Sequence, residues 1–296
     1  MDDLPHPATT PQPTSSSLVE RLVMALALTF AFWVLQSIAI ALTAGIAHAT
    51  GIATVDLRQL AKRADTAPIL LVLAVADLAT AVLVAFGVWA STRSLAALAL
   101  SRRGAVLSFV YALPLLMLGV VLPAFANYAS HHRFAAPGVD ATLAATFVLL
   151  GIAVAIVEEL VFRGVLMTML GVERQPWLAI TVSAVIFAAL HAAGPGSPQS
   201  VFNNMVQVTG LVAIPFACIR AVSGSVVGLI AAHALIDTTS VLELGGFHLP
   251  APPSQAETLM QEALAFVVAS GYLIWAYVRI RRARAAQALS GIDFVS

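Results

Sequence analysis

The chain has 296 residues, of which 60% are hydrophobic and only 10% are charged, with a mean hydropathy of +0.93. Soluble domains carry about 25% charged residues, so this composition excludes an ordinary soluble protein and indicates a polytopic membrane protein. The formal net charge is zero, and Cys218 is the only cysteine. The composition therefore predicts no nucleic-acid partner, and it excludes an internal disulfide framework and a multi-cysteine metal site.

The apolar segments predict an all-α fold, a polytopic transmembrane helical bundle of about eight spans, because one span needs about 20 apolar residues. In the third span, Pro114 should introduce a kink. The predicted spans are residues 22–47, 67–90, 104–126, 140–170, 177–193, 202–221, 224–243 and 263–280.

The same pattern divides the chain into four segments. Residues 1–17 are rich in Pro, Ser and Thr and should form a disordered cytoplasmic tail. Residues 18–138 then hold the N-terminal transmembrane helices, and residues 139–244 form a core that carries the motifs. Residues 245–296 comprise the last loop, the final transmembrane helix and a basic cytoplasmic tail.

Basic residues near the span ends predict the orientation. With both termini inside, the cytoplasmic segments hold ten basic residues and the outer loops hold four. Abundant arginine and alanine are typical of GC-rich coding, which favours a bacterium. We therefore expect an integral, multi-pass protein of a bacterial plasma membrane, surrounded by lipid, with both termini cytoplasmic.

Charged residues inside the spans need an explanation, because each one costs roughly 2.5–3.5 kcal/mol at a helix centre. The fourth span contains "EELVFRG", with Glu159 and Arg163 four residues apart on one helix face, where they can pair. This pair could serve helix packing alone or take part in chemistry. Glu158 lies about 100° away without a basic partner, which makes it the better candidate for a general base. Asp77, alone in the second span, should face a cavity or pair with an arginine.

Two later spans carry histidines. In "FAALH", Phe187 precedes His191 by four residues and should pack against its ring. In "HALID", His233 and Asp237 share a helix face, so the aspartate could fix the tautomer of the ring or act as a further ligand. Rough depths along the spans allow these carboxylates and imidazoles to meet at one level.

These segments fit three motifs in order: "EELVFRG" fits EExxxR, "FAALH" fits FxxxH, and "HALID" fits HxxxD/N. The chain thereby resembles the CAAX protease and bacteriocin-processing (CPBP, or Abi) family of intramembrane proteases. The resemblance runs from about residue 140 to 243 and makes residues 139–244 the CPBP/Abi catalytic core. The first three spans carry no motif of this family.

The resemblance implies an intramembrane endopeptidase that hydrolyses membrane-associated or prenyl/CAAX-like peptide or protein substrates. Glu158 and His191 would activate a water molecule, while His233 and Asp237 would orient the substrate or stabilise the oxyanion. An ionised aspartate cannot donate a hydrogen bond, so Asp237 would have to be protonated or to orient His233. The implied catalytic residues are Glu158, Glu159, His191, His233 and Asp237, with Arg163 as an ion-pair partner.

Two alternatives remain at this stage. In a metalloprotease, Glu159, His191 and His233 would bind zinc and Glu158 would be the base. We favour the metal-free mechanism, which requires no cofactor; the HExxH motif is absent. A non-catalytic protein, such as a proton-coupled transporter or an immunity or scaffold protein, could use the same groups, although no internal inverted repeat points to a transporter.

Overall fold

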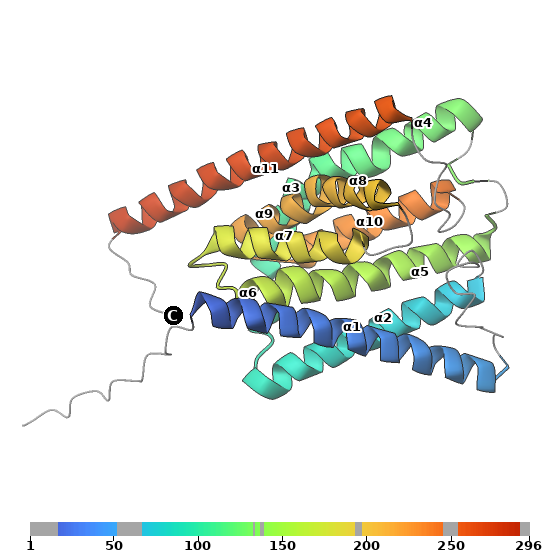
Figure 1. The fold of residues 1–296 in the computed structure, drawn as a ribbon, viewed down its shortest axis with the longest axis horizontal. Helices are drawn as coiled ribbons and strands as arrows, with labels where there is room; N and C mark the ends of the chain where they lie inside the picture. Colours follow the sequence, from blue (N-terminus) through green and yellow to red (C-terminus); the bar gives the residue numbers. More distant parts are fainter. Residues whose placement is uncertain are drawn as a thin grey trace, which may run out of the picture.

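A computed structural model describes residues 17–51, 67–132, 134–136, 139–192, 197–244 and 254–290, and helices are the regular elements of these ranges (Figure 1). The predicted tail, residues 1–17, lies outside the described residues except for Ser17. The loop 245–253 also lies outside them. The helices of the first half are α1 (Leu18–Ala49), α2 (Ala67–Thr92), the 3₁₀ turn η1 (Ala96–Leu98), α3 (Arg102–Leu116), the π-helix η2 (Met117–Val121) and α4 (Leu122–His131).

The second half contains the segments with the three motifs. One continuous helix begins as α5, changes to a π-helix and ends as α6, and a second composite helix runs from α8 to α9. The elements are α5 (Ala141–Glu158), the π-helix η3 (Glu159–Leu166), α6 (Met167–Met169), α7 (Pro176–Ala192), α8 (Pro198–Val208), the π-helix η4 (Thr209–Ala213), α9 (Ile214–Ser223), α10 (Val227–Leu244) and α11 (Gln255–Ser290).

The structure confirms a polytopic helical bundle. Within the described residues, α7 is a shorter apolar helix of 17 residues and α10 has 18 residues; they correspond to the fifth and seventh predicted spans. Six other stretches are long and apolar enough to cross a membrane: Leu18–Ala49, Ala67–Thr92, Ala96–Ala129, Ala141–Met169, Pro198–Ser223 and Gln255–Leu289.

Two spans show details that the sequence pattern did not indicate. The helix predicted to kink at Pro114 continues past it and becomes the π-helix η2 three residues later. Proline has no N–H to donate, which favours a local change of hydrogen-bond register. In the final span, α11 continues through the basic cluster to Ser290. The Ala, Arg, Gln and Leu residues there are strong helix formers.

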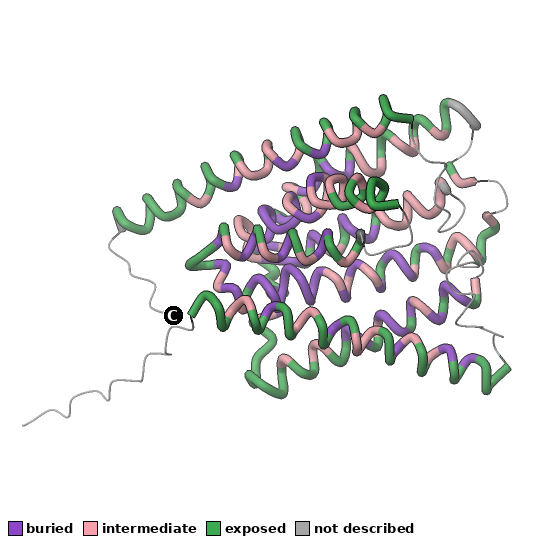
Figure 2. Tube along the Cα trace, in the orientation of Figure 1, coloured by how far each residue is buried: buried purple, intermediate pink, exposed green. Residues whose placement is uncertain are grey.

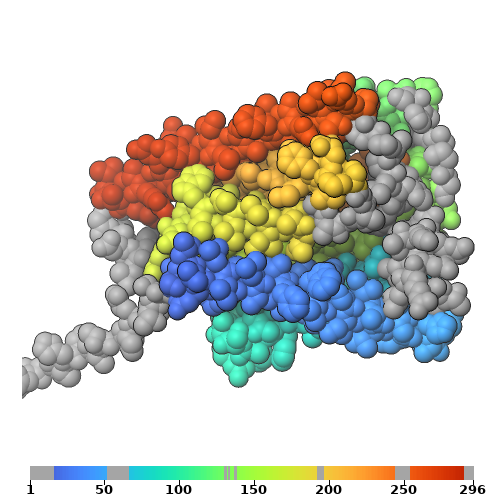
Figure 3. Space-filling model, in the orientation of Figure 1, coloured from blue at the N-terminus to red at the C-terminus, as the bar shows by residue number. Residues whose placement is uncertain are grey.

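Burial increases from the outer helices to the motif-bearing span. In the most apolar window of each span, 56% of α5–η3–α6 is buried inside the protein, against 17% of α1 and 17% of α11. Figure 2 shows the mostly exposed faces of α1 and α11 on opposite sides of the buried helices. On the face seen in Figure 3, α7 lies between these two outer helices. The exposed faces are apolar, as expected for helices that contact lipid.

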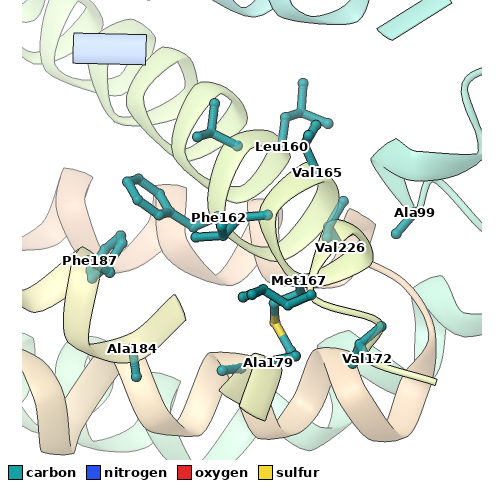
Figure 4. Packing of buried hydrophobic residues seen from close by; sticks show 14 of the residues in the cluster. Ala99, Leu160, Phe162, Val165, Met167, Val172, Ala179, Ala184, Phe187 and Val226 are labelled. Atoms are coloured by element: carbon teal, nitrogen blue, oxygen red, sulfur yellow. The ribbon is translucent and has the colours of Figure 1, made fainter. Parts of the chain in front are cut away.

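The largest apolar cluster surrounds η3 (Figure 4). Phe162 of η3 packs edge-on against Phe187 of α7, with ring centroids 5.2 Å apart, and against Phe32 of α1 at 5.9 Å. Leu166 and Met167 are fully buried in the same cluster. The segment with the first motif is therefore fixed by packing on several sides.

Close helix crossings depend on glycine. A Cβ atom at Gly228 of α10 would overlap the backbone of Ala105 and Phe109 in α3. The Gly228 N–H donates to Ser108 Oγ at 3.0 Å across the same crossing. Small residues allow such contacts between membrane helices. This crossing fixes the position of α10, which carries His233 and Asp237.

We predict that Gly228→Ala destabilises the bundle by about 1–3 kcal/mol, because the added methyl group has no room at the crossing. The matched control is Gly87→Ala in α2, where a Cβ atom meets nothing within 4 Å; this change should be neutral or stabilising by up to about 1 kcal/mol. Unfolding of the purified variants by detergent titration measures both effects. Equal stability of the two variants would contradict the prediction.

Candidate active site

The first motif lies where the fourth span changes from α-helix to π-helix. Glu158 is the last residue of α5 and Glu159 is the first of η3. A π-helix replaces i→i+4 hydrogen bonds with i→i+5 bonds and frequently occurs at functional sites. The two neighbouring glutamates consequently have different surroundings: the side chain of Glu159 is completely buried, whereas that of Glu158 is 14% exposed.

Glu159 is held by two polar partners. Its Oε1 accepts a hydrogen bond from Arg163 Nη1 at 3.0 Å, which is the ion pair that the i,i+4 spacing predicts. The same oxygen lies 2.9 Å from Nδ1 of His233 in α10. The arginine is also completely buried, and its Cζ lies 4.0 Å from the centre of the Phe187 ring. A cation over an aromatic face gains electrostatic stabilisation.

Glu158 faces both imidazoles from the other side. Its Oε1 lies 3.5 Å from His191 Nε2 and its Oε2 lies 3.7 Å from His233 Nε2. The side chain of His191 is 35% exposed, whereas that of His233 is 6% exposed. Glu158 and His191 thus form the accessible part of the cluster, and Glu159 and His233 form its buried part.

The tautomer of His191 follows from its hydrogen bond to the backbone. Its Nδ1 lies 2.9 Å from the carbonyl oxygen of Phe187, so Nδ1 carries a proton and donates it. In the neutral ring, Nε2 is then an acceptor, and it faces Glu158. The Phe187 ring stacks on the imidazole with centroids 4.2 Å apart, as the spacing in "FAALH" predicts.

The third motif brings another carboxylate to the cluster. Asp237 Oδ2 lies 3.4 Å from His233 Nε2, on the face of α10 that the i,i+4 spacing predicts. His233 therefore has a glutamate at one ring nitrogen and two carboxylates near the other. Phe216 of α9 packs edge-on against this imidazole, with centroids 5.6 Å apart. The ring is consequently fixed on its polar and its apolar sides.

Two further residues support the cluster but do not belong to a motif. Arg220 of α9 is buried, and its Nε donates to the backbone carbonyl of Arg163 at 3.1 Å. From its position near the end of a predicted span, Arg220 is one of the ten basic residues that the sequence places on the cytoplasmic side of the membrane. Asn204 of α8 donates from Nδ2 to the carbonyl of His191 at 3.0 Å, at the end of α7. The sequence signal for Arg220 was an arginine that follows directly on an apolar stretch. Nothing in the sequence pattern indicated Asn204.

Asp77 does not belong to this site. Its Oδ1 accepts a hydrogen bond from Gln36 Nε2 at 2.8 Å, which joins α2 to α1. The sequence predicts a cavity or an arginine partner for Asp77, whereas its partner in the structure is a neutral amide. This buried contact gives Asp77 a role in helix packing.

The residues of the metalloprotease alternative, Glu159, His191 and His233, have polar partners within the cluster. Glu159 Oε1 is occupied by Arg163 and His233, and the nearest carboxylate to His191 is that of Glu158. A cation bound to Glu159 would also face the positive charge of Arg163. Within the described ranges, no group of three or more His, Cys, Asp or Glu side chains has the arrangement of a metal site. Glu159 therefore has Arg163 and His233 as its polar partners in this arrangement.

Comparison with known proteins provides an independent observation. Residues 140–239 match the family model described as "Type II CAAX prenyl endopeptidase Rce1-like". No curated protein and no solved structure is significantly similar to the chain. The matched segment begins at the N-cap of α5 and ends in α10, so it contains all three motifs. A protease family together with membrane-spanning helices supports an integral membrane protease. Over residues 140–239, the chain is thus similar to the CAAX prenyl endopeptidase family, the family that its three motifs resemble.

Proposed function

We propose that the protein is a glutamate-type intramembrane endopeptidase in which Glu158 and His191 together activate water. One observation carries the proposal: a glutamate oxygen and an imidazole nitrogen from separate helices lie 3.5 Å apart, and both side chains are partly exposed. The other glutamate of the pair is buried and occupied by an arginine. Of the two glutamates, Glu158 is thus the one that substrate and water can reach.

The hydrogen-bond roles at this contact suit the activation of water. An ionised Glu158 and the Nε2 of a neutral His191 are both acceptors, so neither can donate to the other. A water molecule that donates one O–H to each group satisfies both. Glu158 then accepts a proton while the water oxygen attacks the scissile carbonyl carbon, and the protonated glutamate subsequently gives that proton to the leaving amine.

His233 is the donor for the oxyanion that forms in this attack. Its Nδ1–H donates to Glu159, so a second proton on Nε2 points toward Glu158 and Asp237. Asp237 orients this ring and stabilises its protonated form. Because His233 is the donor, the ionised aspartate does not have to donate a hydrogen bond to the oxyanion. A fixed, positively charged donor in a site shielded from water stabilises a developing oxyanion strongly.

We further propose that the substrate is a membrane-associated or prenylated, CAAX-like peptide. The site lies within helices of a membrane bundle, which a membrane-anchored peptide reaches by lateral diffusion. The described chain begins and ends at the same end of the bundle (Figure 1), in agreement with the proposed cytoplasmic location of both termini.

The test of this function is cleavage of a fluorogenic, membrane-anchored reporter peptide by purified protein in liposomes. We predict that His191→Ala lowers the rate by about 10²-fold or more, because one acceptor of the activating pair is lost. The control is His48→Ala, at an exposed histidine near the end of α1, which should retain wild-type activity.

Full activity of His191→Ala would overturn the water-activating pair. A zinc chelator added to the same assay tests the metal-free mechanism separately. We expect the rate to be unchanged, whereas inhibition that added zinc reverses would show that a metal takes part.

A further inference from the structure

A basic cavity lies outside the candidate active site, at the end of the bundle where α7 begins and α11 ends. It has a volume of about 440 Å³, within the range of small-molecule sites. Arg279, Arg282 and Arg284 of α11 line one side, and Glu173 and Pro176 line the other. None of these residues belongs to the three motifs.

The positive charge of this cavity is not compensated locally. Its only lining carboxylate in the described residues, Glu173, faces the buried Arg220, with Oε1 3.9 Å from Nη1. Arg279 donates to the Tyr111 hydroxyl at 3.0 Å and Arg284 to the carbonyl of Arg174 at 3.1 Å, and both acceptors are neutral. Three guanidinium groups therefore remain available to an anion.

An apolar groove lies next to this cavity, between α3 and α11. It has a volume of about 380 Å³, and its lining is mostly apolar: Val110, Pro114, Leu115, Val268, Gly271 and Trp275 take part. Tyr111 also lines the groove, and its hydroxyl is the group that Arg279 of the basic cavity contacts. Arg279 therefore connects the basic cavity to the apolar groove.

Aromatic residues indicate the depth of the basic cavity in the membrane. Trp177 at the start of α7 and Tyr277 of α11 pack together with ring centroids 6.3 Å apart, and both are exposed. Exposed Trp and Tyr are enriched at the level of the lipid headgroups. The C-terminal part of α11 extends beyond the ends of α1 and α7 (Figure 1), and Arg279 follows Tyr277 by two residues in this helix. An apolar groove that leads to basic residues at this level matches the shape and charge of a phospholipid.

We propose that this combined site binds one anionic phospholipid, with its phosphate group among the three arginines and an acyl chain in the groove between α3 and α11. The inference does not depend on the proposed proteolysis, because the two sites share no residue. A bound lipid would bridge α3, α7, α9 and α11 and thereby stabilise the bundle at this end.

Binding is measured with full-length protein in detergent micelles by titration with phosphatidylglycerol and, in parallel, with phosphatidylcholine. Each arginine near the membrane surface raises the affinity for an anionic lipid about fivefold. The triple variant Arg279→Gln/Arg282→Gln/Arg284→Gln should therefore bind phosphatidylglycerol on the order of 100-fold more weakly. The matched control carries the same charge change at other exposed arginines of this end, Arg93→Gln/Arg102→Gln/Arg103→Gln, and should bind as the wild type does.

A separate variant tests the groove that would hold the acyl chain. Gly271→Leu places a side chain in the groove, where a Cβ atom meets nothing within 4 Å, and it should weaken phosphatidylglycerol binding; Gly87→Leu is the control. Unchanged binding by the triple variant or by Gly271→Leu would overturn the proposal, as would equal weakening by the control triple variant. Displacement of phosphatidylglycerol by an equal concentration of soluble glycerol phosphate would show an anion site and would likewise overturn it.

Discussion

Glu158→Gln is expected to lower kcat for reporter-peptide cleavage by about 10²–10⁴-fold, the usual contribution of a general base. Glutamine retains the size of the side chain and can donate to His191, but it cannot accept the proton of the attacking water. The binding of substrate should change little, so the loss should appear in kcat and not in KM. Rates measured over a range of reporter concentrations separate the two parameters.

A loss of activity in Glu158→Gln reports on the reaction only if the variant remains folded. Among the residues that the structure describes, Glu158 has no basic side chain within ion-pair distance except the two histidines, so its replacement by an amide should leave the protein folded. Glu262→Gln is the control, at a half-buried glutamate of α11 outside the site, and it should be fully active. A Glu158→Gln variant that is folded and as active as the wild type would exclude this glutamate as the base.

Contacts within one helix could be predicted from the sequence because spacing alone determines them. Glu159 and Arg163 form the ion pair of an i,i+4 spacing, Phe187 stacks on His191, and Asp237 lies beside His233 on one face of α10. Each of these contacts requires only that the segment be helical. The same holds for the spans themselves, whose apolar stretches are long enough to be recognised individually.

Contacts between helices could not be predicted in the same way. The 2.9 Å contact between His233 Nδ1 and Glu159 depends on how α10 packs against the fourth span. The buried position of Arg220 depends on the carbonyl of Arg163, in the π-helix. Hydrophobic periodicity does not reveal a π-helix as short as η3 or η4, because so few residues show no period of their own. The sequence therefore indicated which residues lie in the site, whereas the packing of the helices determines which of them are buried and which are accessible.

The second large expected effect is on stability, and it concerns the buried glutamate of the pair. Arg163→Met is expected to destabilise the protein by about 3–5 kcal/mol, because it removes the arginine from the buried Glu159 carboxylate and leaves His233 as its remaining partner. The variant also loses the contact of the guanidinium with the Phe187 ring. Unfolding by detergent titration measures the effect, and Arg281→Met, at an exposed position of α11, is the matched control.

A double-mutant cycle separates the charge pair from the loss of packing. Adding Glu159→Gln to Arg163→Met removes the unpaired charge, while the glutamine oxygen can still accept from His233, so the double variant should regain a large part of the lost stability. If Glu159 and Arg163 serve packing and the orientation of His233, the refolded double variant should also retain measurable cleavage, unlike Glu158→Gln. A double variant that is stable yet as inactive as Glu158→Gln would instead assign the ionised Glu159 a direct part in the reaction.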